Sequence, residues 1–249
     1  MSLKIPPIIG HRGACAYAPE NTIESIRTAA DMGVKWVEMD VMLTRDSVPI
    51  IFHDDTLDRT TNGSGNVAER DWADIRELEA GSWFADSFSG IKIPTLDEAL
   101  EAIIDLGLGL NLEIKPTPGR EIETAEVALD VLSRVWDDHD KLLLSSFQHV
   151  SLETAKDMAP EWSRGLLLWH DDMPADWEEL AKYLDVASVN ISDQLASREF
   201  IEEIIDLKKA VCVYTINDAQ RARQLQGWGV DAFFTDMPDV LQESLLKVH

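Results

Sequence analysis

The fold is decided by residues 7–43, which read PIIGHRGACAYAPENTIESIRTAADMGVKWVEMDVML. Apolar runs at Pro7–Gly10 and Trp36–Leu43 predict two strands, and the amphipathic run between them, Asn21–Met32, predicts a helix. Asn21 is expected to cap this helix, because an acidic residue follows it at the spacing of a capping box. A strand, a helix and a second strand form the βαβ unit from which parallel sheets are built.

The same alternation continues along the rest of the sequence. Further strands are expected at Pro49–His53, Leu108–Ile114, Leu142–Phe147, Ser163–Leu168, Val186–Ile191, Ala210–Thr215 and Ala232–Thr235. Further helices are expected at Leu96–Ile104, Ile122–Trp136, Leu152–Met158, Ala175–Tyr183, Arg198–Leu207, Ala219–Trp228 and Pro238–Lys247. If Pro49–His53 is a companion of the second strand, eight strands and eight helices remain. The sequence therefore predicts an α/β fold, a TIM (β/α)₈ barrel, for which about 250 residues is typical.

Residues 54–94 interrupt this alternation. They contain a run of polar and glycine residues followed by a tryptophan-containing segment, and they are too long for an ordinary barrel loop. We interpret them as a small inserted subdomain, after the second strand region, within a single barrel made by residues 1–249.

The composition restricts the possible partners. The formal net charge is −24, which should repel both nucleic acid and anionic membranes. The sequence lacks the run of roughly 20 apolar residues that a transmembrane helix needs, and its first residues lack a long apolar secretory stretch. We therefore expect a cytoplasmic protein without stable membrane association or nucleic-acid binding, either a monomer or a homo-oligomer. Its two cysteines, Cys15 and Cys212, are expected to be buried or loop thiols.

Three carboxylates lie on predicted strands. Glu38 and Asp40 are two residues apart, so their side chains should share one face of a strand, and Glu113 lies on another strand. Such a group suits one hard divalent cation, Mg²⁺ or Ca²⁺. The alternative is that they form plain ion pairs with the cations Lys115 and Arg12. Barrel active sites lie where the strands end, which favours the metal site.

Two histidines, His11 and His53, each end a predicted strand and suggest a general acid and a general base. Arg12 and Lys115 are the expected contacts for an anion. The remaining histidines are expected in solvent, except that His149 lies closer to the predicted rim. Tyr214 is as well suited to barrel packing as to substrate contact.

These residues belong to longer stretches that resemble the bacterial glycerophosphodiester phosphodiesterases, in particular the small cytoplasmic form. The resemblance extends over nearly the whole sequence. The matching stretches are Gly-His-Arg-Gly at 10–13, Pro-Glu-Asn-Thr at 19–22, Glu-Met-Asp at 38–40, His-Asp-Asp-Thr-Leu-Asp-Arg-Thr-Thr-Asn-Gly-Ser-Gly at 53–65, Glu-Ile-Lys at 113–115, Ser-Ser-Phe at 145–147 and Gly-Val-Asp-Ala-Phe-Phe-Thr-Asp at 229–236. One departure is Tyr214, where many relatives have tryptophan, and it leaves the shape of the alcohol pocket open.

The resemblance implies a TIM barrel that hydrolyses small glycerophosphodiesters to sn-glycerol 3-phosphate and an alcohol such as choline or ethanolamine. It implies one metal bound by Glu38, Asp40 and Glu113, acid and base roles for His11 and His53, and phosphate contacts from Arg12 and Lys115. The sequence does not choose which histidine is the acid, nor between direct water attack and a cyclic phosphate. Two rivals are a lysophospholipase D-like activity and a catalytically silent barrel that binds a phosphorylated metabolite.

Overall fold

The structure is a computed structural model, and it describes residues 4–245. Eight parallel strands form a closed barrel, because the first strand pairs with both the second and the last, and a ninth strand, β3, is antiparallel. The strands are β1 (Ile8–Gly10), β2 (Trp36–Leu43), β3 (Pro49–Ile51), β4 (Gly109–Ile114), β5 (Leu142–Ser146), β6 (Ser163–Leu168), β7 (Ser188–Ser192), β8 (Ala210–Tyr214) and β9 (Ala232–Thr235).

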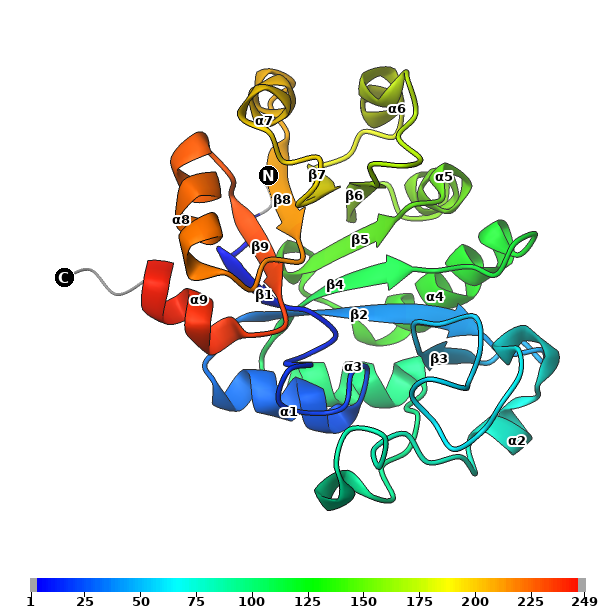
Figure 1. The fold of residues 1–249 in the computed structure, drawn as a ribbon. Helices are drawn as coiled ribbons and strands as arrows, with labels where there is room; N and C mark the ends of the chain where they lie inside the picture. Colours follow the sequence, from blue (N-terminus) through cyan, green and yellow to red (C-terminus); the bar gives the residue numbers. More distant parts are fainter. Residues whose placement is uncertain (1–3, 246–249) are drawn as a thin grey trace.

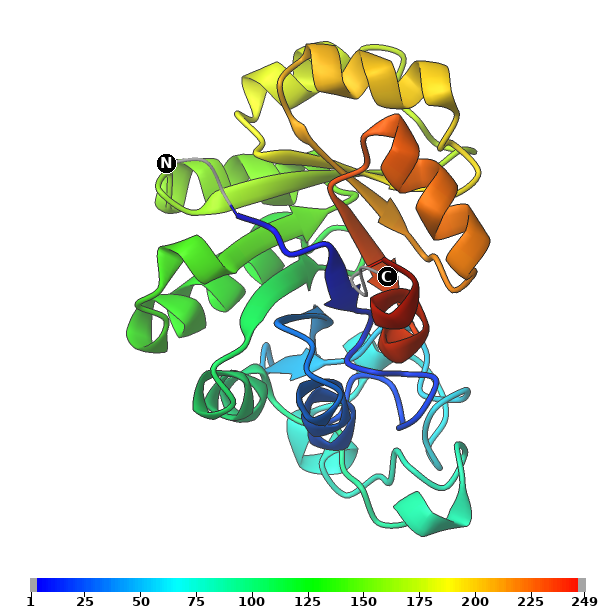
Figure 2. The same ribbon diagram turned by 90° about the vertical axis from the view of Figure 1, so that its left-hand side faces the viewer.

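Helices cover the outside of the barrel, as Figures 1 and 2 show. They are α1 (Ile23–Asp31), α3 (Leu96–Asp105), α4 (Glu121–Val135), α5 (His149–Met158), α6 (Trp177–Tyr183), α7 (Arg198–Asp206), α8 (Ala219–Trp228) and α9 (Pro238–Leu245). The predicted TIM barrel is confirmed. The expected extension of the last helix to Lys247, and the solvent position expected for His249, fall outside the described residues.

Alternation along β2 directs two kinds of side chain to opposite faces. Val37, Met39 and Val41 are fully buried and belong to the apolar cluster that the barrel forms with helices α1, α3 and α4. Because side chains alternate along a strand, Glu38 and Asp40 face the barrel interior. The apolar residues of β2 thus fix the strand while its carboxylates reach the inside.

The expected capping of α1 by Asn21 is wrong. Thr22 is the N-cap, and its hydroxyl accepts from the backbone N–H of Ser25, whose side chain completes the capping box. Asn21 has a left-handed backbone (φ 56°), and its Nδ2 donates to Oδ2 of Asp40 at 2.8 Å. Asparagine tolerates that conformation better than most residues. The structure therefore uses Asn21 to hold a carboxylate of the barrel rather than to start a helix.

The expected strand Pro49–His53 is present as β3, a companion of β2, but it ends at Ile51, so His53 lies beyond its end. The barrel part of β2 pairs with β4 up to Val41, and the last residues of β2 extend beyond it to pair with β3. β3 runs back antiparallel, so the backbone N–H of Phe52 donates to the carbonyl of Asp40 at 3.0 Å. The backbone just before His53 therefore lies beside Asp40, at the end of the barrel where the carboxylates are.

The segment from 54 to 94 lies at the edge of the barrel, below it in both views (Figures 1 and 2). It contains short helices, η1 (Val67–Glu69), α2 (Trp72–Ile75) and η2 (Asp86–Phe88), and no strand among its residues, all of which the structure describes. Leu57, Val67 and Ile75 pack with Ile50 and other residues in a separate apolar cluster. Within residues 4–245, no helix is both long and apolar enough to cross a bilayer.

Candidate active site

The turn at Gly10–Gly13 is shaped by close backbone packing. A Cβ at Gly10 would lie 2.3 Å from the carbonyl oxygen of Gly13, and one at Gly13 would lie 2.4 Å from Oγ of Ser25. Gly13 also has a positive φ of 86°, which favours glycine. The turn directs the backbone N–H of Arg12 to Oε2 of Glu38 at 2.9 Å. Both glycines therefore hold His11 and Arg12 against the mouth of the barrel.

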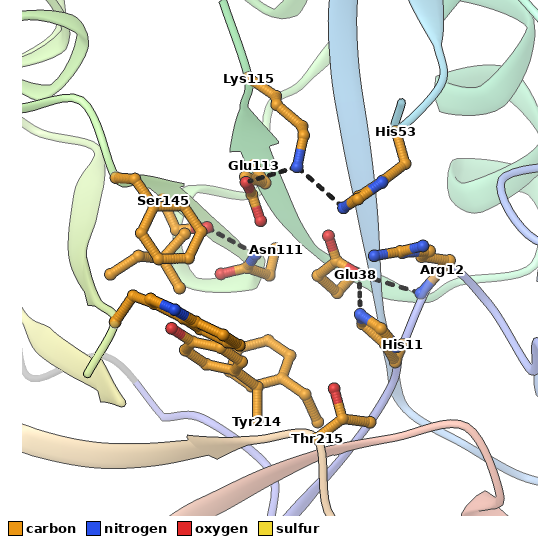
Figure 3. Close-up of a pocket in the computed structure, with 14 residues that line it drawn as sticks. His11, Arg12, Glu38, His53, Asn111, Glu113, Lys115, Ser145, Tyr214 and Thr215 are labelled. Carbon is orange, nitrogen blue, oxygen red and sulfur yellow. Dashed lines mark hydrogen bonds and ion pairs between the residues drawn. The ribbon is translucent and has the colours of Figure 1, made fainter. Parts of the chain in front are cut away.

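The expected site residues come together around one cavity of about 410 Å³. Its lining includes six of them, His11, Arg12, Glu38, His53, Glu113 and Lys115. Asp40 is buried beside it, with a carboxylate oxygen within 4.8 Å of those of Glu38 and Glu113. Figure 3 shows the two histidines, Arg12 and Lys115 on one side of the cavity and Tyr214 on the other.

The three carboxylates form a dense cluster of buried negative charge. Burial and the neighbouring carboxylates raise the pKa of Glu38 well above its usual value, and burial and Asp40 raise that of Glu113 to about 7. Oε1 of both glutamates is buried and makes no hydrogen bond to any described residue. A buried carboxylate oxygen that accepts no hydrogen bond is unfavourable unless a nearby cation compensates for it. The cluster therefore fits a hard divalent cation.

Asp40 behaves differently from the two glutamates. Burial favours its neutral form, but the positive charges of Arg12 and Lys115 and the hydrogen bond from Asn21 lower its pKa. Nε of Arg12 lies 3.4 Å from Oδ2 of Asp40, and Nζ of Lys115 lies 3.9 Å from Oε1 of Glu113. The two cations thus contact the carboxylate cluster, and they also line the cavity where an anion could bind.

His53 is held in one tautomer. Its Nδ1 lies 2.6 Å from Oδ1 of Asp54, and its Nε2 lies 2.8 Å from Nζ of Lys115. A carboxylate accepts and an ammonium donates, so Nδ1 carries the proton and Nε2 accepts. Burial, with the positive charges of Arg12 and Lys115, lowers the pKa of His53. The neutral ring can therefore accept a proton at Nε2.

His11 has the same kind of support from another part of the chain. Its Nδ1 donates to Oδ1 of Asp236 at 2.6 Å, and its Nε2 lies 4.0 Å from Oε2 of Glu38. Asp236 is itself held by Nδ2 of Asn217 at 2.7 Å. The Nε2 atom of His11 therefore points at a carboxylate, whereas that of His53 points at an ammonium group.

Aromatic rings form the opposite wall. Phe147, Trp169 and Tyr214 line the cavity, and the rings of Trp169 and Tyr214 are nearly parallel, with centroids 6.3 Å apart. The hydroxyl of Tyr214 donates to the carbonyl of Leu168 at 2.7 Å. Tyr214 therefore packs against the barrel rim and also lines the cavity, and its contact with substrate stays a prediction. His149 is exposed as the first residue of α5 and does not line this cavity.

The sequence did not single out several residues that the structure brings to the site. Asp54 and Asp236 hold the histidines, and Asn111 and Ser145 line the cavity. Asp54 directly follows His53, which was a usable signal. Asp236 is 225 residues from its partner, so pairing it with His11 required the closed barrel.

Comparison with known proteins gives a consistent result. The model described as the Glycerophosphoryl diester phosphodiesterase family matches residues 11–240. A glycerophosphodiester phosphodiesterase from Caldanaerobacter subterraneus subsp. tengcongensis is 32% identical over 238 residues, covering 94% of this chain and 95% of that protein.

Two solved structures are also similar over nearly their full lengths. One is an Oleispira antarctica phosphodiesterase in complex with the product sn-glycerol-3-phosphate, with 40% identity, a TM-score of 0.90 and 98% of each chain covered. The other is a glycerophosphodiester phosphodiesterase from Agrobacterium tumefaciens, with 28% identity, a TM-score of 0.78, and coverage of 96% of this chain and 100% of that chain. This chain therefore belongs to the glycerophosphoryl diester phosphodiesterase family, and the enzyme class predicted from its motifs, glycerophosphodiester phosphodiesterase, is confirmed.

Proposed function

We propose that this protein hydrolyses small glycerophosphodiesters, such as glycerophosphocholine and glycerophosphoethanolamine, to sn-glycerol 3-phosphate and the free alcohol. The observation that carries the proposal is the arrangement of two carboxylate-held histidines, His11 and His53, beside a buried carboxylate cluster in one cavity. The bound product of the Oleispira antarctica relative supports sn-glycerol 3-phosphate as the product here.

Arg12 and Lys115 would bind the phosphate. Both cations line the cavity, and a guanidinium and an ammonium together can contact several phosphoryl oxygens. Glu38, Asp40 and Glu113 would hold one divalent ion, Mg²⁺ or Ca²⁺, through the oxygens that lie within 4.8 Å of one another. When bound, such an ion supplies positive charge for the negative charge that develops on the phosphoryl oxygens.

His53 is the better candidate for the general base and His11 for the general acid. His53 has a lowered pKa and an accepting Nε2, so it can take a proton from the attacking hydroxyl, whether of water or of the glycerol. Nε2 of His11 lies 4.0 Å from Oε2 of Glu38, and no ammonium group among the described residues donates to it. His11 can therefore donate a proton to the departing alcohol oxygen.

The decisive experiment is a coupled assay for sn-glycerol 3-phosphate, with several glycerophosphodiesters as substrates, with and without EDTA. We expect release of the product from glycerophosphocholine, loss of activity with EDTA, and recovery with Mg²⁺ or Ca²⁺. Full activity of the metal-free protein would refute the metal site. Faster turnover of a lysolipid would favour the lysophospholipase D-like alternative, and binding without product would favour a silent barrel.

Location and assembly are a separate part of this proposal. The cytoplasmic location, the absence of membrane and nucleic-acid partners, and the choice between monomer and homo-oligomer stay predictions. Cell fractionation and light scattering of the purified protein test them.

A further inference from the structure

The side chain of Arg59 joins two carboxylates near the cavity. This residue lies in the segment that follows β3, outside the barrel strands. Its Nη1 and Nη2 donate to the two oxygens of Glu20 at 2.7 Å each. Its Nε and Nη2 donate to the two oxygens of Asp54 at 2.6 and 2.9 Å. One guanidinium therefore makes four hydrogen bonds to two acidic side chains.

Each of these carboxylates also holds a residue of the site. Oε1 of Glu20 accepts from Nη1 of Arg12 at 2.7 Å, and Oδ1 of Asp54 accepts from Nδ1 of His53 at 2.6 Å. Arg59 is thus two contacts away from the expected phosphate ligand and from the expected base. It reaches both through different partners.

The chemistry of the guanidinium suits this position. Its planar set of donors matches two carboxylates at once, which the single ammonium group of a lysine cannot reproduce. The hydrogen bonds from Arg59 and His53 keep the pKa of Asp54 far below its usual value, and those from Arg59 and Arg12 lower the pKa of the largely buried Glu20 despite the cost of its burial. Both carboxylates stay ionised and therefore accept from the site residues.

We propose that Arg59 is a positioning residue, which fixes His53 through Asp54 and Arg12 through Glu20 and so sets their geometry for the reaction. The inference rests on the proposed function, because it assigns Arg59 a role in that reaction. The segment after β3 then contributes to the site, although no residue numbered from 54 to 94 lines the cavity.

The first test compares Arg59→Ala, Arg59→Lys and a matched control, Arg45→Ala. Arg45 also makes paired hydrogen bonds to a carboxylate, at 2.8 and 2.5 Å to Asp71, but it is exposed and does not line the cavity. Loss of a group that orients a catalytic residue reduces activity on the order of 10–100-fold. We expect such a loss, mainly in kcat, for Arg59→Ala, little recovery in Arg59→Lys, and unchanged kinetics in Arg45→Ala.

Thermal stability separates positioning from a general structural effect. The side chain of Arg59 is 45% exposed, but its partner Glu20 is only 11% exposed, so Arg59→Ala should lower the Tm somewhat more than Arg45→Ala does. We expect Arg59→Ala to stay folded at the assay temperature, so that its loss of kcat is not a loss of folded protein. A fall in kcat that only matches a fall in the folded fraction, or equal kinetics in the two alanine variants, would overturn the inference.

A double-mutant comparison tests the route of the effect. In a Glu20→Gln/Asp54→Asn background the two carboxylates are already neutral, so Arg59→Ala should cost much less activity than in the wild type. Equal fold-losses in the two backgrounds would show that Arg59 does not act through these partners.

A measurement without turnover separates this inference from the proposed function. The ¹⁵N NMR signals of His53, assigned by comparison with His53→Ala, should report a protonated Nδ1 in the wild type and in Arg45→Ala. In Arg59→Ala the same signals should move toward the average expected for a ring that exchanges between its two neutral tautomers. If the wild type is inactive on every diester but the signals change as expected, the function is wrong and the positioning stands. If the wild type is active and neither signals nor kcat respond to Arg59→Ala, the inference alone fails.

Discussion

At the scale of single residues, the two histidines have the same support but different surroundings. Each donates from Nδ1 to a carboxylate at 2.6 Å, which leaves Nε2 for the cavity. We expect His11→Ala and His53→Ala each to reduce kcat on the order of 10²–10⁴, the usual size of a general acid or base contribution. The measurement is steady-state kinetics on glycerophosphocholine. His149→Ala is the control, because that exposed histidine lies at the start of α5 and should leave kcat unchanged.

The acid and base assignments can be separated by the leaving group. A substrate with an activated leaving alcohol, such as a nitrophenyl diester, needs no proton from the enzyme as the bond breaks. We therefore expect this substrate to restore much of the activity of His11→Ala and little of that of His53→Ala. The opposite pattern would exchange the two roles.

Local sequence predicted the charged residues better than it predicted their partners. His11, His53 and the three carboxylates are chemically distinctive and lie near expected strands. Asp54 could have been assigned from its position beside His53. Asp236 could not, because its contact with His11 exists only when β9 pairs with β1 to close the barrel.

At the scale of elements, the turn between β1 and α1 depends on a glycine for two reasons. Gly13 has φ +86°, and a Cβ there would meet Oγ of Ser25 at 2.4 Å. Gly33 has nearly the same φ, +82°, but no atom within 4 Å of an added Cβ. Positive φ costs an alanine about 1–2 kcal/mol, and overpacking adds about 1–3 kcal/mol. Urea unfolding should therefore show a greater decrease in the free energy of unfolding for Gly13→Ala than for Gly33→Ala. Equal decreases would mean that α1 shifts enough to accommodate the added methyl group.

Element types followed from the alternation of apolar and amphipathic runs, whereas the direction of β3 and the N-cap of α1 did not. Pro49–Ile51 is too short for its sequence to show that it runs antiparallel, and that direction is what returns His53 to the level of Asp40. Asn21 and Thr22 are both good N-cap residues. The choice between them is made by Asp40, a tertiary contact that a local pattern does not contain.

At the scale of the whole molecule, the protein carries a net charge of −24, although its cavity is expected to bind an anionic diester. Arg12 and Lys115 are already engaged with carboxylates there, so they do not make the cavity strongly positive by themselves. A divalent ion would balance the buried cluster and leave both cations available for phosphate. The charge of the whole chain and the geometry of the site thus both favour the proposed divalent ion.

The proposed metal site predicts that stabilisation by the metal depends on pH. The pKa of Glu113 rises from 4.5 to about 7 in the fold, and that of Glu38 also rises. A carboxyl group with a raised native pKa holds its proton more tightly when folded, so the metal-free protein loses stability from Glu113 as pH rises from about 4.5 to about 7. Glu38, whose pKa is also raised, adds a loss of the same sign. A divalent ion competes with those protons. The gain in Tm on adding Mg²⁺ or Ca²⁺ should therefore be small near pH 5 and larger near pH 8.

Calorimetry at the two pH values, with metal and with EDTA, measures this gain directly. The contributions of other titrating groups to Tm largely cancel in the difference between the samples with metal and with EDTA. The acidic surface makes a control necessary, because divalent ions also screen exposed carboxylates without binding to the site. Glu113→Gln removes a ligand, whereas Glu179→Gln removes the same charge from an exposed position in α6. We expect only the former to abolish the pH-dependent part of the gain. An equal gain at both pH values, or equal behaviour of the two variants, would place the ion on the surface rather than between Glu38, Asp40 and Glu113.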